Sequence, residues 1–350
     1  MTQADLSAAL RVLPKAELHL HLEGAIRPHT AVELAGRYGV TFTEDEARQR
    51  YQYSDFLGFI EIFKWVTSFL RQPADYALIT RRLAEELVAQ NVVYAEVTVA
   101  LGVLLWRNQT AEPIFEAVWG VAQEFEAKGL TLRWIPDGTW QFGAEAAMSA
   151  ATIAAGLQHL GVIGFGMGGD EMALPYRDFR PVYDYVASHG LRRVAHAGEV
   201  GPPQHVRDAI ELLGAERIGH GIAAIHDPAL AEVLTSRRIA LEVCPTSNIC
   251  TGALAKQLAK ARASLAEHPL KALFQAGVPL TLSTDDPAMF HTDLLSEYGN
   301  CASVFGFSAA DMLRLAESSF AHSFLAPGQK AAFLQRFRAS ANRSALSSEF

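Results

Sequence analysis

Two histidines near the start of the chain have the spacing of a metal-ligand pair. His19 and His21 lie two positions apart in the segment Lys15–Gly24, so on a β-strand their side chains would share one face. The intervening leucines would fill the opposite, buried face. Neutral imidazole is a good ligand for zinc and similar ions. The pair therefore predicts metal binding, with two polar residues at a surface strand edge as the alternative.

Further histidines and carboxylates follow other apolar segments of the chain. Burying so many polar groups is costly unless they serve a purpose, so their convergence at one site is the favoured interpretation. A catalytic zinc needs three or four N or O ligands and an open position for water. His19, His21, His196 and either Asp285 or Asp286 supply that set. The other segments in this group are Gly168-Gly-Asp-Glu171, His196-Ala-Gly-Glu199, Gly219-His-Gly221, Cys244-Pro-Thr-Ser-Asn248 and Ser283-Thr-Asp-Asp-Pro287.

The segment Gly161–Asp170 bears on the number of metal ions. Barrels that bind two metals commonly use a lysine at the end of the fourth strand as a bridging ligand, and this segment contains no lysine. The sequence therefore predicts one metal ion, whose bound water would have its pKa lowered to about 7. An adjacent histidine or carboxylate could then complete the deprotonation.

Two other motifs suggest different chemistry and are rejected. The glycines from Gly164 to Gly169 match the dinucleotide fingerprint, but Asp170–Pro175 follows where a helix should hold the pyrophosphate. His21-Leu-Glu23 matches half of the cytidine-deaminase signature, but no P-C-x-x-C segment follows it.

Strand and helix patterns alternate along the chain and must position these residues. This alternation implies right-handed crossovers and a parallel sheet. Eight strand–helix units fit a closed (β/α)8 TIM barrel. In such a barrel the catalytic residues lie at the carboxyl ends of the strands. The fold class is therefore α/β. The first strand lies within Lys15–Gly24, and the others are expected at Val92–Val99, Leu130–Ile135, Val162–Gly168, Leu191–His196, Arg217–His220, Ile239–Cys244 and Val278–Thr284.

We expect a single domain over residues 1–350, because no Pro/Gly/Ser-rich linker divides the chain. Residues 24–90 would form a helical cap inserted after the first strand. In this insertion, the aromatic residues of Asp55–Leu70 recur at helical spacing and are expected to pack in the core. The alternative is that some of them form an apolar lid over the site. The expected helices are Pro28–Tyr38, Asp55–Leu70, Pro73–Gln90, Ala111–Lys128, Ala144–His159, Tyr176–His189, Pro203–Leu213, Asp227–Ser236, Pro269–Ala276 and Leu294–Phe305, with Ser308–Ser323 and Pro327–Ala341 at the end.

Composition excludes several classes of partner. The formal charge is −8, from 30 basic and 38 acidic residues, with no basic run, which argues against nucleic acid or an anionic membrane. Three scattered cysteines imply no disulfide framework. The N-terminal segment Met1–Pro14 lacks the apolar region of a signal peptide, and no apolar run approaches the roughly 20 residues that span a bilayer. We expect a soluble cytoplasmic protein.

Six of these segments resemble the adenosine deaminase family in order and spacing. They are Lys15–Ile26, Gly169-Asp-Glu171, His196-Ala-Gly-Glu199, Arg217-Ile-Gly-His-Gly221, Cys244-Pro-Thr-Ser-Asn248 and Ser283-Thr-Asp-Asp-Pro287. The resemblance extends from about Pro14 to the C-terminal helices. It implies a zinc-dependent barrel, with one Zn²⁺ per chain, that replaces the 6-amino group of an adenine ring with oxygen and releases ammonia.

The resemblance also implies roles for individual residues. Glu199 would hold the proton delivered to ring N1, which requires a buried, protonated carboxyl. His220 would orient the zinc-bound hydroxide and take up its proton. Asp286 would interact at ring N7, and the backbone N–H of Gly169 would meet N3. The zinc ligands would be His19, His21, His196 and Asp285, of which His21 would also contact the substrate and Asp285 would take part in catalysis.

The substrate is the point at which the chain departs from adenosine deaminases. Those enzymes usually have Asp where this chain has Glu23, which would face the 5′ end of the nucleoside. The adenine-specific branch shares this Glu but usually has a Ser-Ser-Glu type sequence in place of Gly168–Glu171. Phe63–Leu70 and Trp134–Gly143 are similar to a branch that deaminates 6-amino-6-deoxyfutalosine in menaquinone synthesis.

That substrate carries a carboxyphenyl-ketone arm at its 5′ position, and it is favoured slightly over adenosine. Lys64, Arg177 or Arg180 could meet the carboxylate, although solvated surface charge is the favoured role of each. Three alternatives remain. They are an adenine deaminase, an amidohydrolase for an unrelated C–N bond, and a non-catalytic nucleoside-binding barrel.

Overall fold

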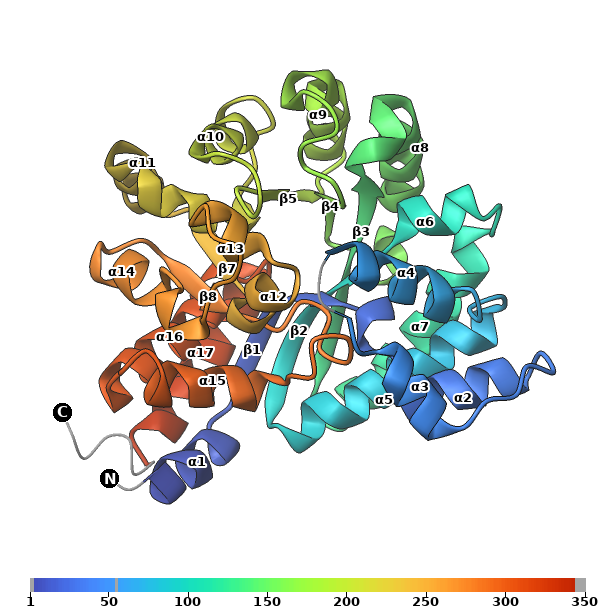
Figure 1. Cartoon of the computed structure of the whole chain (residues 1–350), viewed down its shortest axis with the longest axis horizontal. Helices are drawn as coiled ribbons and strands as arrows, with labels where there is room; N and C mark the ends of the chain where they lie inside the picture. The colour runs from blue at the N-terminus through green and yellow to red at the C-terminus, as the bar shows by residue number, and fades with distance from the viewer. Residues whose placement is uncertain (1–2, 54–55, 344–350) are drawn as a thin grey trace.

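The computed structural model describes residues 3–53 and 56–343, and within these residues eight parallel strands form one sheet in chain order. Figure 1 shows helices surrounding these strands, which confirms the predicted (β/α)8 barrel. The strands are β1 (Lys15–His21), β2 (Val92–Val99), β3 (Thr131–Thr139), β4 (Gly164–Gly168), β5 (Arg192–Ala197), β6 (Arg217–His220), β7 (Ala240–Val243) and β8 (Leu280–Leu282).

The barrel closes between its first and last strands, beside the residues predicted to bind metal. The backbone N–H of His21 donates to the carbonyl of Asp285 at 2.8 Å, and the N–H of Asp285 donates to the carbonyl of His19 at 3.1 Å. These bonds extend the sheet past the end of β8. Closure of the barrel and placement of the histidines against Asp285 therefore depend on the same backbone contacts.

Amphipathic helices cover the outside of the barrel. In α7 (Ala111–Glu126), for example, Ile114, Phe115, Val118, Val121 and Phe125 recur at helical spacing and are buried. The remaining helices between β3 and β8 that correspond to predicted ones are α8 (Gly143–Gly156), α9 (Arg180–Ser188), α10 (Pro203–Glu211), α11 (Pro228–Arg237) and α14 (Leu270–Gln275).

A helix from the C-terminal part of the chain packs across the closure of the barrel. The expected helix Leu294–Phe305 corresponds to α15 (Leu294–Ser303), but α16 (Ala309–His322) packs on both β8 and β1. The last helix, α17 (Pro327–Ala341), packs against α16.

The segment between β1 and β2 is helical, as expected for 24–90. It contains α2 (Pro28–Gly36), α3 (Glu44–Arg50), α4 (Phe56–Thr67) and α5 (Pro73–Ala89). Helix α5 packs against α7 and β2 as part of the outer ring, whereas α4 lies nearer the barrel axis (Figure 1). Residue 55, where the α4 segment was expected to begin, lies outside the described residues. The treatment of 1–350 as one domain with this insertion as its cap stays a prediction.

Several elements differ from the sequence prediction. Strand β3 was expected to end at Ile135, yet it continues to Thr139 with Pro136 paired opposite Val99, although proline cannot donate to a sheet. The unexpected helices are α1 (Gln3–Val12), α3, α6 (Leu101–Trp106), α12 (Pro245–Cys250) and α13 (Ala253–Gln257). Within residues 3–53 and 56–343, no helix is long and apolar enough to cross a membrane.

Candidate active site

The predicted metal ligands converge at the carboxyl ends of the strands. His19 Nε2 lies 3.4 Å and His21 Nε2 lies 3.3 Å from Asp285 Oδ1, and the rings of His19 and His196 are 4.5 Å apart. His19, His196, His220 and Asp285 each offer a ligand atom within 4.8 Å of the others. The most compact set thus contains His220 in place of His21.

Two residues of this cluster have strained backbones. His220 has φ of 59° and Asp285 has φ of 67°, in the left-handed region that residues other than glycine rarely adopt. Such strain costs about 1–3 kcal/mol per residue and persists where the surrounding structure fixes a functional geometry. The strain lies at the ends of β6 and β8, where both side chains point into the cluster.

A buried ionic network orients His19. Its Nδ1 donates to Glu242 Oε2 at 2.8 Å, and Glu242 is held in turn by Arg217, which also binds Glu96. These residues are buried in the barrel interior. Sequence reasoning missed this network, although charged residues inside the apolar segments of β2, β6 and β7 were a usable signal.

The electrostatics around the histidines fit a cation. Burial alone would lower the pKa of His19, but Asp285 and Glu242 outweigh it and raise that pKa to about 10. Two carboxylates thus favour positive charge at this place. Burial lowers the pKa of His21 to about 4 and that of His196 well below its usual value. Those two imidazoles are therefore neutral, as metal ligands must be.

The free ring nitrogens also suit a metal. His196 Nδ1 donates to the carbonyl of Met167 at 3.0 Å, so the Nε2 of this neutral ring carries a lone pair. The Nε2 of His19 would offer one once a bound cation displaces the proton that its raised pKa retains. Among the described residues, the buried Nε2 atoms of His19 and His21 have no hydrogen-bond partner. With Asp285 they form a donor set of three imidazoles and one carboxylate, which is a common set for zinc.

The tandem aspartates have different surroundings. Asp285 accepts a hydrogen bond from Ser247 at 2.6 Å, and although burial opposes ionisation, hydrogen bonding and charge from the histidines hold its pKa well below the usual range. Burial and the charge of Asp285 raise the pKa of Asp286 well above its usual value. A Cβ at Gly24 would lie 1.8 Å from Asp286 Oδ1, so only glycine leaves room for that carboxyl.

Glu199 has the properties of a proton donor. It follows β5, accepts a hydrogen bond from Thr251 at 3.3 Å and lies 3.7 Å from His220 Nε2. Burial first, and then the charges of Asp285 and Glu171, raise its pKa to about 8. The carboxyl is therefore mostly protonated at neutral pH.

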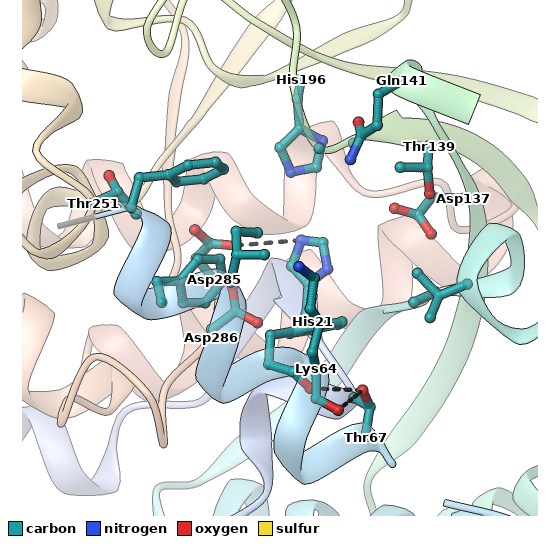
Figure 2. A pocket seen from close by; sticks show the side chains of 18 of the residues that line it. His21, Lys64, Thr67, Asp137, Thr139, Gln141, His196, Thr251, Asp285 and Asp286 are labelled. Carbon is teal, nitrogen blue, oxygen red and sulfur yellow. Dashed lines mark hydrogen bonds and ion pairs between the residues drawn. The ribbon is translucent and has the colours of Figure 1, made fainter. Parts of the chain in front are cut away.

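A cavity of about 250 Å³ begins at this cluster. Figure 2 shows Asp137, Thr139 and Gln141 along one side of it, with Asp285 and His21 pointing toward each other. Gly169 lines the wall with φ of +85°, and a Cβ there would lie 2.6 Å from Gln141 Oε1. The outer wall is apolar and comes largely from α4 and α6: Phe56, Phe59, Ile60, Phe63, Val103 and Trp106, with Phe142 and Phe290.

The structure distinguishes among the residues proposed for the far end of the substrate. Glu23 is only 3% exposed and is not part of the cavity wall; its Oε1 accepts from the N–H of Ala100. Its Oε2 has no hydrogen-bond partner within the described part of the chain. Lys64 lines the mouth, where its exposed ammonium pairs with Glu61 at 3.0 Å. Arg177 and Arg180 lie on the surface, beside Asp178 and Asp184.

Sequence reasoning missed two charged residues of the cavity wall. Asp137 is 7% exposed, and its Oδ1 has no hydrogen-bond partner among residues 3–53 and 56–343. It follows an apolar run, as the other polar strand ends do, but Pro136 concealed the pattern. Arg107 lies in the mouth and donates to the carbonyls of Thr67 and Lys64; its cation adjoining an aromatic segment was the available signal.

Comparison with known proteins decides the family. The model of the family described as adenosine deaminase matches residues 14–340. The chain belongs to the adenosine deaminase family. It is accordingly a deaminase, a hydrolase of C–N bonds in cyclic amidines, and the prediction of adenine-type deamination is confirmed. The family is metal-dependent, and the group of histidines with Asp285 can hold a metal.

Individual relatives agree with this assignment. The chain is 39% identical to the aminodeoxyfutalosine deaminase of Streptomyces coelicolor over 332 residues, which cover 93% of this chain and 84% of that protein. It is 35% identical to the adenine deaminase of Agrobacterium fabrum, with 93% and 98% covered. The crystal structure of adenine deaminase from Arthrobacter aurescens superposes with a TM-score of 0.86 at 28% identity, covering 93% and 98% of the two chains.

Proposed function

We propose that this deaminase hydrolyses the 6-amino group of 6-amino-6-deoxyfutalosine, a step of menaquinone synthesis, and releases ammonia. The observation that carries the choice of substrate is the outer cavity, where an aromatic wall adjoins two cations. Lys64 and Arg107 stand at the same mouth as Phe63 and Trp106. An aromatic arm that ends in a carboxylate would fill such a mouth, whereas free adenine would leave it empty.

The proposal includes one zinc ion per chain, held by His19, His21, His196 and Asp285. The lone pairs on the Nε2 atoms and the charge of Asp285 support this ligand set. A bound zinc ion supplies a Lewis acid that lowers the pKa of a coordinated water to about 7 and makes it nucleophilic.

The residues around the cavity then act on the purine. Glu199 holds a proton and donates it to ring N1, which makes C6 electrophilic. Asp286, on the same wall, interacts at N7, and the backbone N–H of Gly169 binds N3. The apolar wall excludes water from the ring, which strengthens each of these polar interactions.

An adenine deaminase is the second candidate, because relatives of that name are 33–36% identical to this chain. A non-catalytic nucleoside-binding barrel is disfavoured by the complete set of donors and by the raised pKa of Glu199. A cytoplasmic location and the absence of a nucleic-acid partner, both expected from the sequence, stay predictions.

A panel of substrates tests the proposal. Metal-replete protein is assayed by the loss of adenine absorbance with aminodeoxyfutalosine, adenosine, 5′-deoxyadenosine, methylthioadenosine and adenine. We expect the highest kcat/KM for aminodeoxyfutalosine and about one zinc per chain by elemental analysis. Preference for adenine would favour the second candidate, and inactivity toward the whole panel would contradict deamination of this substrate class.

A further inference from the structure

A buried histidine outside the cavity begins a chain of hydrogen bonds that leads into the site. His268 precedes α14 and is 4% exposed. Its Nδ1 accepts the backbone N–H of Leu270 at 3.1 Å. A backbone amide can only donate, so this nitrogen carries no proton. Burial lowers the pKa of His268 to about 3, and the neutral ring therefore carries its single proton on Nε2.

The side chain of Asn248, on α12, accepts a hydrogen bond from this Nε2–H group. His268 Nε2 lies 3.1 Å from Asn248 Oδ1, and since Nε2–H is a donor, the atom facing it must be the amide oxygen. This fixes the orientation of the amide. Its nitrogen, Nδ2, then lies 3.1 Å from Nδ1 of His220 and donates to it.

The proton on His220 follows from these two bonds. Because Nδ1 accepts from Asn248, the neutral ring of His220 must be protonated on Nε2, the nitrogen that faces the site. That nitrogen lies 3.8 Å from Asp285 Oδ2 and 3.7 Å from Glu199 Oε2. His19 and His196 have the opposite arrangement, since each donates from Nδ1.

We propose that the amide of Leu270, His268 and Asn248 form a relay that fixes His220 as its Nε2–H tautomer. His220 is then a hydrogen-bond donor at the site and not a metal ligand, in spite of its place in the most compact donor set. This inference rests on the proposed function for its catalytic meaning. It also revises the expected role of His220, because a protonated Nε2 orients an oxygen atom without accepting a proton from it.

Asn248 and His268 are accordingly positioning residues. Both are buried and neither lines the cavity. Their side chains form hydrogen bonds with each other, with the backbone of Leu270 and with His220. An apolar pair could fill the same volume without the cost of burying polar groups. The polar pair is therefore explained by its effect on the tautomer of His220.

The direct test is nitrogen NMR of protein labelled with ¹⁵N-histidine, with and without zinc. Signals are assigned by His220→Gln and His268→Gln. We expect His220 and His268 to show the Nε2-protonated pattern in both samples, and His196 the Nδ1-protonated pattern. His19 should show the Nδ1-protonated pattern only with zinc, because its pKa of about 10 keeps both ring nitrogens protonated without the metal. A Nδ1-protonated His220, or zinc ligation by His220, would overturn the proposal. This readout needs no substrate, so its failure is distinct from failure of the proposed function.

Asn248→Asp provides the second test. A carboxylate cannot donate to Nδ1, so His220 should switch to the Nδ1–H tautomer, and kcat should fall about 100-fold with KM and zinc content unchanged. His268→Gln, which keeps an acceptor and a donor, should retain more turnover than His268→Leu, with the exposed His29→Leu as control. An unchanged tautomer in Asn248→Asp, or equal turnover in both His268 variants, would contradict the relay.

Discussion

At the scale of single residues, the carboxyl group of Glu199 is the proposed proton donor. Burial and neighbouring charge keep it protonated at neutral pH, so it can donate to a purine nitrogen. We expect Glu199→Gln to lower kcat by about 10³-fold, within the usual range for loss of a general acid. The amide occupies nearly the same volume, so zinc content by elemental analysis should not change. Turnover equal to that of the wild type would remove Glu199 from the mechanism.

Asp137 is the second residue whose surroundings predict an effect on activity. Its Oδ1 has no hydrogen-bond partner among the described residues, and a Cβ at Gly168 would lie 2.9 Å from its Oδ2. The carboxyl thus lies beside the strand end that is predicted to meet purine N3, on the side of the sugar. An unpaired buried acceptor suits a sugar hydroxyl.

Burial raises the pKa of Asp137 well above its usual value and favours the neutral carboxyl. We therefore expect Asp137→Asn to lower kcat/KM for the nucleoside substrate by about threefold to tenfold, the value of one hydrogen bond between neutral groups. Free adenine lacks the sugar, so any activity on it should change much less. The measurement is the kcat/KM of the variant and of the wild type on the nucleoside and on adenine. An equal loss on both would show that Asp137 acts on the purine or on folding.

At the scale of elements, the loop after β5 determines where Glu199 lies. Glu171 accepts the backbone N–H groups of Gly198, Val200 and Gly201 at 2.6–2.7 Å, and His205 lies 3.2 Å from its carboxylate. Burial opposes ionisation of Glu171, but these hydrogen bonds outweigh it and lower its pKa. One carboxylate after β4 thus holds the loop that follows β5.

The lowered pKa predicts how stability depends on pH. A carboxylate whose folded pKa is depressed contributes stability above its unfolded pKa, near 4.5, and loses it as the pH falls through the folded value. We expect Glu171→Gln to lower the free energy of unfolding by about 3 kcal/mol at pH 7. The difference from wild type should shrink below pH 4.5, as measured by denaturant unfolding. The exposed Glu116→Gln, in the middle of α7, is the control and should change the free energy of unfolding by less than about 0.5 kcal/mol at every pH.

At the scale of the whole molecule, Arg217 connects strands that are distant in sequence. From β6 it binds Glu96 on β2 and Glu242 on β7, and it donates to the carbonyl of His322 at the end of α16. Through Glu242 this network reaches His19. The stability of the barrel and the orientation of a proposed metal ligand, His19, therefore both depend on one buried cation.

Replacing Arg217 by Leu would leave Glu96 and Glu242 buried without their cation. Breaking a buried ionic network in this way costs about 3–5 kcal/mol, and we expect that loss in denaturant unfolding, together with weaker zinc binding. Arg81→Leu is the matched control, because Arg81 pairs with Glu124 on the surface and such pairs contribute below about 1 kcal/mol. Equal effects of the two substitutions would contradict this account.

The sequence by itself determined the barrel, the family and the convergence of the polar strand ends. Alternating apolar segments specify strands and helices locally, and parallel strands must bring their carboxyl ends to one rim. For that reason His19, His21, His196 and either Asp285 or Asp286 could be named before any coordinates, and the family resemblance selected Asp285. Their roles as ligands stay predictions, supported by the lone pairs that the hydrogen bonds leave on the imidazoles.

Only the tertiary structure decided which protons and charges these residues carry. The tautomer of His220 depends on His268, 48 positions away in the chain, and the orientation of His19 depends on Glu242. The place of Asp137 in the cavity depends on a strand that continues through a proline. Such contacts join residues with no periodic relation in the sequence, and burial sets their strength, so no local pattern can specify them.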